Sequence, residues 1–294
     1  MAMKSISIVK LLALLGLLIF IPGVTATAAF ALQESTPQSG GDPRVQAREY
    51  LNEGVRAYKE AHFDEAIDDF KKAKELDPLF ENASLYLATA YATQYVPGAP
   101  SPENVRFGDL AVQEFREILN KDSNNLSAID GISAILYNLG GTPFDEKKLR
   151  DSKAYREKHI LLKPDDSEPY YWVGVIDWSL CYRANKRLRE EYNKTSSQPV
   201  KAEEALPAGL SADFDRQYRA TMDEGITDLQ NAIRLKSDYT DAMAYLNLLY
   251  RQKVDMDSST VLREEDLRKA DDLIDEIKAI KTKHPDNQTS PYVT

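Results

Sequence analysis

The chain is poor in the residues on which catalytic and metal sites depend. Among 294 residues there is one cysteine, Cys181, and there are three histidines, at positions 62, 159 and 284. A lone cysteine excludes a disulfide within the chain, and at a helical position it is most simply a small core residue. No histidine stands at metal-ligand or triad spacing from another candidate residue. We therefore expect a protein that is not an enzyme, with no catalytic residue, no metal site and no cofactor.

Phosphate-binding glycine loops and positive charge are also scarce. The pair Gly140-Gly141 falls in an expected turn between helices, so it needs no ligand. The chain has 37 Lys and Arg residues against 47 Asp and Glu residues, which gives a formal net charge of −10. General nucleic-acid-binding proteins are basic. We therefore expect no nucleic acid as a partner.

Only one long hydrophobic run is present, Leu11 to Ile21, and it lies near the N-terminus. Two lysines precede this run, and a Pro-Gly break and small residues ending at Ala31 follow it, which is the order of an export signal. The order predicts a signal peptide over residues 1–31 and an exported protein, periplasmic or extracellular. An uncleaved anchor helix is the alternative, although the Pro-Gly break interrupts a span that needs about 20 residues.

The rest of the chain divides by composition. Residues 32–46 are polar and rich in Ser, Pro and Gly, and they predict a flexible leader. Residues 285–294 predict a disordered tail. The segment 47–284 is left for the folded body.

The folded body opens with the 34 residues AREYLNEGVRAYKEAHFDEAIDDFKKAKELDPLF, which start at Ala47. Gly54, Ala66, Phe70 and Pro78 stand at the spacing of the small, small, aromatic and proline positions of the tetratricopeptide repeat, so this stretch resembles that two-helix unit. The small residues let two helices approach closely, the phenylalanine fills the gap between them, and the proline ends the second helix.

The same template can be followed along the chain, which indicates five helix pairs that stack to bury a continuous core. The third copy is the weakest match, because Ser152 and His159 stand where small apolar residues are usual. The resemblance implies an all-α fold, a right-handed superhelical solenoid of about five tetratricopeptide helix pairs with enlarged turns inside the repeats. The expected copies are residues 47–80, 81–125, 126–166, 167–239 and 240–284.

The copies after the first exceed the template length between their two helices. The largest insertion, in the fourth copy, predicts a long helical hairpin tipped by residues 193–210, with its second helix beginning near Ser211 as an N-cap. The combination of a VPGAPSPEN loop, a YYWVGVIDWSLCYR helix and a DAMAYLNLLYR helix is similar to exported tetratricopeptide-repeat proteins of environmental bacteria. This similarity implies the same fold and export from the cytoplasm, but it implies no catalysed reaction.

The resemblance also implies where a partner binds, because in this family the first helix of each pair lines a concave groove. Aromatic side chains prevail at the groove positions. The candidate partner-binding residues are Tyr58, Tyr86, Tyr137, Tyr171, Trp172, Trp178, Tyr182 and Tyr245.

Two interpretations of the fourth copy's aromatic line stay open. Tyr171, Val175, Trp178 and Tyr182 are spaced by 4, 3 and 4 residues, which puts them on one helix face. They could be core, or they could form an exposed aromatic floor, since the packing side is already supplied by other residues of the helix. Those other residues are Val173, Gly174, Ile176 and Leu180.

A basic run follows on the same helix: Arg183, Lys186, Arg187 and Arg189. In an acidic protein such a run could meet an anionic surface, and the alternative is a solvated helical extension.

Together these observations predict an extracytoplasmic scaffold that binds a protein or peptide in an aromatic groove. The alternative is a cell-envelope component that binds a glycan or polymer on the same rings, and contact with the cell envelope is compatible with both. An enzyme that uses the repeats as a frame is the third class, disfavoured by the missing catalytic residues.

Overall fold

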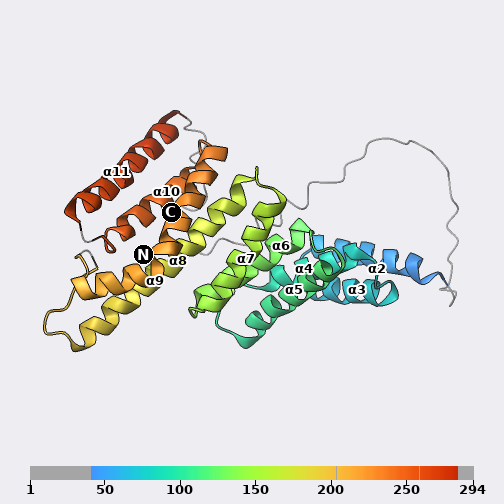
Figure 1. Ribbon diagram of the computed structural model, residues 1–294. Helices are drawn as coiled ribbons and strands as arrows, with labels where there is room; N and C mark the ends of the chain where they lie inside the picture. The colour runs from blue at the N-terminus through green and yellow to red at the C-terminus, as the bar shows by residue number, and fades with distance from the viewer. Residues whose placement is uncertain (1–40, 203, 258, 284–294) are drawn as a thin grey trace. The chain divides into compact units, whose positions relative to one another are not determined.

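The computed structural model describes residues 41–202, 204–257 and 259–283, and these residues form α-helices and turns without a strand (Figure 1). The expected all-α class is confirmed. The predicted signal peptide and C-terminal tail lie outside the described residues. None of the helices described is both long and apolar enough to cross a membrane.

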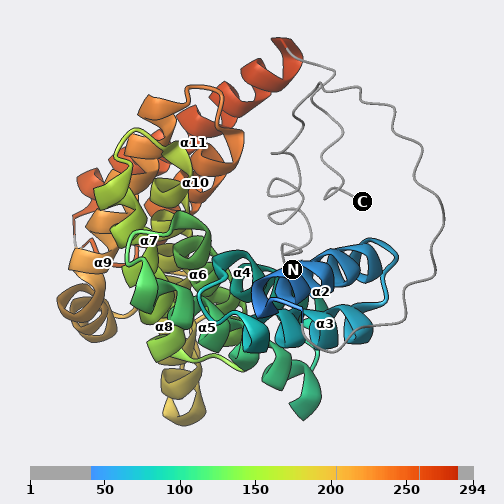
Figure 2. The same ribbon diagram turned by 90° about the vertical axis from the view of Figure 1, so that its right-hand side faces the viewer.

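The chain divides into two compact units that meet at the Pro143–Phe144 bond. Unit 1 holds two helix pairs and one further helix. In both views α2 and α3 lie side by side (Figure 1 and Figure 2). Its helices are α2 (Pro43–Lys59), α3 (Phe63–Leu76), α4 (Glu81–Gln94), α5 (Pro102–Lys121) and α6 (Leu126–Gly141).

Unit 2 holds one helix followed by two pairs, of which the first, α8 and α9, is the longer. Its helices are α7 (Glu146–Leu162), α8 (Ser167–Thr195), α9 (Ala208–Leu235), α10 (Thr240–Lys253) and α11 (Thr260–Lys283). The unit boundary falls between α6 and α7, the two helices of the expected third pair, where the match to the repeat template is weakest.

The helix starts after the first copy follow the repeat template. The second to fifth copies were expected to open at Glu81, Leu126, Ser167 and Thr240, and α4, α6, α8 and α10 begin at these residues. The first helix begins earlier, inside the expected leader. There the Asp42 side chain accepts a hydrogen bond from a backbone N–H of the first turn and proline follows at the first helical position, both of which favour a helix start.

Close helix approach at glycine is the packing feature that the repeat template predicts. A Cβ atom added to Gly54 in α2 would lie 2.6 Å from Cε1 of Phe70 in α3. In unit 2 the Leu229 side chain of α9 occupies the space beside Gly174 of α8 in the same way. Phe70 and Leu229 are fully buried, so each glycine sets the distance between the two helices of its pair.

We expect Gly54→Leu to lower the free energy of unfolding by about 3 kcal/mol, because the larger side chain forces α2 and α3 apart. Gly54→Ala should also destabilise, since its one added carbon meets the Phe70 ring. Gly209→Ala is the matched control, because no atom lies within 4 Å of the added carbon and alanine favours a helix. Urea unfolding measures all three, and equal midpoints for Gly54→Ala and Gly209→Ala would show that the packing is wrongly assigned.

The predicted hairpin is present, since α8 and α9 extend beyond the rest of unit 2 (Figure 1). Its loop is held by Arg189, which is 8% exposed and donates to the carbonyl oxygens of Lys201 at 2.7 Å and Glu204 at 2.8 Å. The same guanidinium donates to Asp255 Oδ2 at 2.7 Å. The hairpin loop is therefore tied to the turn between α10 and α11.

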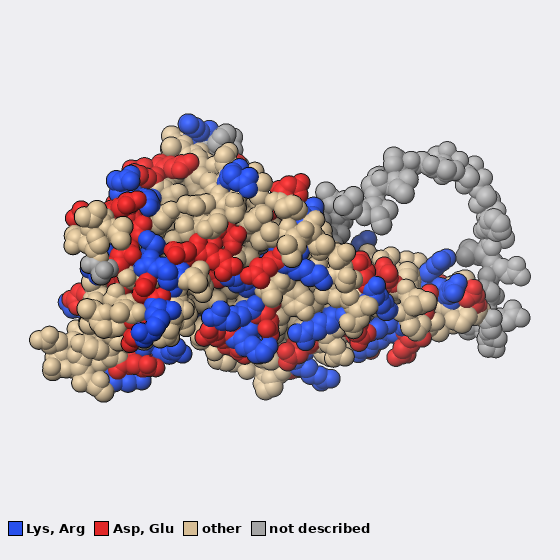
Figure 3. All heavy atoms as spheres, viewed as in Figure 1, with Lys and Arg blue, Asp and Glu red and all other residues tan. Residues whose placement is uncertain are grey.

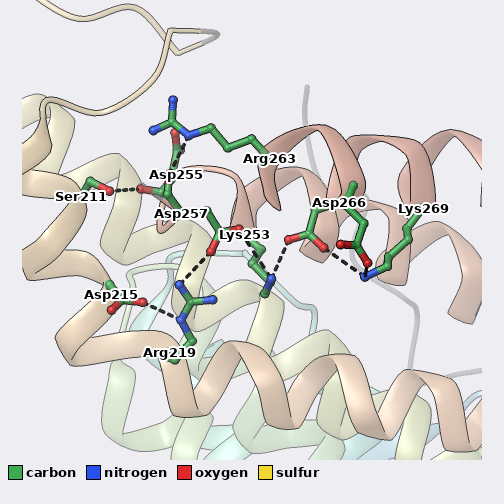
Figure 4. Close-up of polar contacts among 10 residues, drawn as sticks. Ser211, Asp215, Arg219, Lys253, Asp255, Asp257, Arg263, Asp266 and Lys269 are labelled. Carbon is green, nitrogen blue, oxygen red and sulfur yellow. Dashed lines mark hydrogen bonds and ion pairs between the residues drawn. The ribbon is translucent and has the colours of Figure 1, made fainter. Parts of the chain in front are cut away.

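The expected N-cap role of Ser211 is wrong. Helix α9 begins at Ala208, and its N-cap residue is Pro207, which supplies no side-chain cap hydrogen bond. Ser211 lies in the first turn, and its hydroxyl donates to the carbonyl oxygen of Asp255 at 2.7 Å (Figure 4). The residue therefore holds the α10–α11 turn against α9.

A network of charges fixes the same turn from its other side (Figure 4). Arg219 of α9 donates to Asp257 Oδ1 at 3.1 Å, and Asp257 is only 4% exposed. Lys253 at the end of α10 lies 2.6 Å from Asp266 Oδ2 of α11, and Arg263 donates to the Asp257 carbonyl oxygen at 2.6 Å. These contacts join α9, α10 and α11 at one end of unit 2.

Candidate aromatic binding site

Helix α8 presents two different faces along its first half. Its start is capped by Asp166, whose side chain accepts from the Glu168 N–H at 3.0 Å. The predicted packing face is buried, since Val173, Ile176 and Leu180 are at most 1% exposed. The opposite side of α8 faces α10, and this side of α8 carries aromatic residues.

Six aromatic residues of unit 2, here called the aromatic cluster, lie in one chain of ring contacts. The Tyr171 ring centroid lies 5.3 Å from that of Trp172, 5.0 Å from Tyr239 and 5.8 Å from Tyr245. Trp178 lies 5.3 Å from Tyr245 and 5.2 Å from Tyr182. The cluster comprises Tyr171, Trp172, Trp178, Tyr182, Tyr239 and Tyr245.

Exposure within the aromatic cluster rises along α8. Tyr171 is 6% exposed, Trp178 and Tyr245 are half-buried, and Tyr182 is 43% exposed. Of the two interpretations left open, the core one holds at Tyr171, because Trp172 of α8 and Tyr239 and Tyr245 at α10 pack around its ring. The outward part of the cluster is Trp178 and Tyr182, which stack with an angle of 17° between ring planes.

Trp172 is half-buried and held by polar partners. Its Nε1–H donates to Glu168 Oε1 at 3.3 Å, and the guanidinium carbon of Arg156 lies 5.5 Å from the ring centroid. Arg156 is 2% exposed. Trp172 thus connects the aromatic cluster to α7.

Tyr239 belongs to the aromatic cluster but was not predicted. It is the N-cap residue of α10, outside the groove positions of the template. Burial, together with the nearby acids Glu168 and Asp241, raises the pKa of its hydroxyl above the ordinary value. The only sequence feature that could have indicated Tyr239 is its position immediately before a helix. Many loop tyrosines have the same position, so this feature does not single it out.

Unit 1 holds the other three predicted tyrosines. Tyr86 is 39% exposed, with its ring stacked 5.5 Å from that of Phe70. The hydroxyl of half-buried Tyr58 hydrogen-bonds Thr93 Oγ1 at 2.7 Å, and Tyr137 is half-buried. Of these three, Tyr86 offers the most exposed ring. All eight candidates remain a prediction as partner-binding residues.

The described residues were expected to hold no metal site, and their acidic, histidine and cysteine side chains are dispersed. They contain no cluster of three or more His, Cys, Asp or Glu side chains that could hold a metal ion. His62 is exposed beside Glu60 and Glu65. Cys181 is fully buried, and burial raises the pKa of its thiol, so the reactive thiolate is suppressed.

By sequence, the chain is similar to a pilus assembly protein over part of its length. No family model matches the chain. The type IV pilus assembly protein PilF of Pseudomonas aeruginosa is 23% identical over 181 residues, which is 60% of this chain. The chain spans 64% of PilF, less than two thirds of the relative's length.

Solved structures resemble the chain more completely. MamA of Desulfovibrio magneticus RS-1 has a TM-score of 0.51 at 17% identity, with 85% of this chain and 99% of MamA covered. A second MamA structure has a TM-score of 0.53 at 14% identity, with 83% and 97% covered. At these identities the likeness shows the fold alone.

Proposed function

Because the chain has the tetratricopeptide-repeat fold, we propose that it is an extracytoplasmic scaffold that binds a protein or peptide on the aromatic cluster. The observation that supports this most is the Trp178–Tyr182 stack, which combines exposure with fixed geometry. Truncating a Trp or Tyr anchor at the centre of an interface commonly costs about 2 kcal/mol or more of binding.

The rings are held in place before any partner arrives. Trp178 is contacted by Tyr245 edge-on, at 74° between ring planes, and by Tyr182 face-on. Side chains already fixed by packing lose little rotamer freedom on binding, so more of the contact energy is retained as affinity. This favours the cluster over the isolated exposed residues elsewhere, such as Leu161 and Leu79.

The extracytoplasmic location is supported by the N-terminal sequence and by one relative. Residues 1–31 have the order of an export signal. The resemblance to a type IV pilus assembly protein fits a protein of the cell envelope. We therefore place the partner outside the cytoplasm.

Binding of a glycan is the second candidate function, and the geometry of the same stack favours it. Tyr182 is 43% exposed while its ring stacks on Trp178, and the flat face of a sugar would pack on that exposed ring. A glycan and a protein partner would both contact the same rings, so the two functions differ only in the chemical nature of the bound partner. The capture experiment therefore identifies the captured material.

We expect Trp178→Ala combined with Tyr182→Ala to reduce partner capture at least thirtyfold, which corresponds to about 2 kcal/mol. Because other residues form the packing face of α8, the melting midpoint should fall by only a few degrees. Capture uses the chain from residue 32 onward and envelope extract of the producing cell, followed by protein and sugar analysis of what is bound.

Tyr192→Ala is the matched control, since Tyr192 is a half-buried tyrosine of the same helix outside the cluster. It should leave capture unchanged. A large loss of stability in the double variant would instead show that the rings are core. A captured polysaccharide without protein would favour the glycan function.

A further inference from the structure

A second site lies on α8, away from the aromatic cluster. A pocket of about 140 Å³, here called the basic pocket, opens between the start of α7, the extension of α8 and α9. It is lined by the rings of Phe144 and Tyr218 and by the cations Arg183, Lys186 and Arg187. Successive helix residues point about 100° apart. Arg183 and its neighbour Tyr182 therefore project from different sides of α8.

The cations of the basic pocket differ in what already holds them. The guanidinium carbon of Arg183 lies 5.8 Å from the Phe144 ring centroid, and Lys186 lies 3.7 Å from Glu190. Arg187 is exposed, and within the described part of the chain it makes no ion pair. A guanidinium on a ring face donates hydrogen bonds in its own plane, so it can contact a ring and a carboxylate together.

Two acids line the same pocket and limit the charge it can accept. Glu146 accepts from Arg150 at 3.0 and 2.7 Å, and Glu190 has Lys186 as its partner. The lining therefore holds three cations against two acids, a formal excess of one positive charge, which one carboxylate would balance.

A pocket at a comparable place in unit 1 is not basic. Unit 1 has a pocket of about 320 Å³ between α3, α4 and α5, again where the second helices begin and the first helix ends. There three acids line the pocket against two cations. On the face seen in Figure 3 basic and acidic side chains are interspersed in small groups. The unit 1 pocket is lined by Asp64, Asp68, Glu103, Lys71 and Arg106, with Ile67, Tyr91, Phe107 and Leu110.

We infer that the basic pocket binds an acidic peptide segment. A side-chain carboxylate of Asp or Glu in the peptide would accept hydrogen bonds from Arg187, with the positive charge of Arg183 beside it. An adjacent apolar side chain of the peptide would pack on Phe144 and Tyr218. The site is independent of the aromatic cluster, so each can fail without the other.

The test uses a fluorescein-labelled peptide of alternating glutamate and leucine and measures its fluorescence anisotropy with the full chain. We expect Arg187→Glu to weaken binding at least tenfold, and Arg187→Gln to weaken it less. Phe144→Ala should weaken binding about threefold, because Phe144 is exposed and its loss removes one wall of the pocket without opening the core. Lys194→Glu is the matched control, with the same charge change on the same helix outside the pocket, and it should change affinity less than twofold.

Equal losses for Arg187→Glu and Lys194→Glu would overturn the inference, because they would indicate attraction to overall charge. Failure of the wild-type chain to bind the peptide would overturn it too, as would tighter binding of a phosphoserine peptide of the same length. Melting curves of the variants confirm that they are folded. The Trp178→Ala and Tyr182→Ala variant should still bind the peptide, which separates this site from the proposed function.

Discussion

Replacing Lys153 with methionine is expected to lower the free energy of unfolding by about 3–5 kcal/mol at pH 8, since it leaves a buried carboxylate without its cation. Lys153 Nζ of α7 donates to both carboxylate oxygens of Asp177 in α8, at 2.8 and 2.9 Å. Asp177 is fully buried. Lys153 also lies 2.7 Å from Glu224 of α9, so one cation joins three helices of unit 2.

The effect of Lys153→Met should depend on pH. Burial raises the pKa of Asp177 to about 7, even against the attraction of Lys153, and burial with Glu224 raises the pKa of Asp228 to about 6. The folded state therefore binds these protons more tightly than the unfolded chain, and the free energy of unfolding of the wild type falls as pH rises from about 4 to 7. Without Lys153 the pKa of Asp177 should rise further, so the fall should continue above pH 7. The loss caused by Lys153→Met should therefore be smaller at pH 5 than at pH 8.

Urea unfolding at the two pH values measures this, with Lys158→Met as a control on the same helix. Lys158 has no ion pair within the described residues, so its replacement should cost less than about 0.5 kcal/mol. Adding Asp177→Ala to Lys153→Met should recover part of the lost stability, because it removes the unpaired charge. A Lys153→Met protein as stable as wild type at pH 8 would show that the two side chains are not paired.

Replacing Arg189 with methionine is the second large expected effect, with a loss of about 3 kcal/mol and an opened hairpin loop. Its guanidinium donates to Asn185, Asp255 and two loop carbonyl groups, and each acceptor would lose a charged donor. The loop at residues 196–207 should then be cut faster by protease, because its closed form is less populated.

Limited proteolysis and urea unfolding together test the role of Arg189. Lys194→Met removes an exposed cation from the same helix and should leave both measurements unchanged. Wild-type cleavage rates in Arg189→Met would mean that the loop is held by other contacts, such as the Asn193 side chain on Val200.

The helix pairs could be predicted because each repeat position has a local physical cause. The small residue Gly54 leaves the space that the large side chain of Phe70 fills between the two helices. Both residues stand at the fixed spacing of the repeat in the sequence. The openings at Ser167 and Thr240 follow from the same template. Insertions did not disturb these positions, since they fall between the helices of a pair.

Long-range contacts could not be predicted in this way. In the basic run, Arg189 is buried on Asp255, 66 residues later, whereas Arg187 is exposed, and no spacing in the sequence separates the two. Tyr171 is buried because Tyr239 and Tyr245 arrive from α10. The face of a helix can be deduced from its period, but what covers that face depends on the partner helix.

The central claim is that the outward rings of the aromatic cluster contact a partner, and site-specific photocrosslinking tests it most directly. A photoreactive phenylalanine analogue replaces Tyr182, the most exposed ring of the cluster, in the producing cell, and the same analogue replaces Lys194 as the control. We expect a discrete protein adduct from position 182 that is absent from position 194. No adduct at position 182, or the same adducts from both positions, would contradict it.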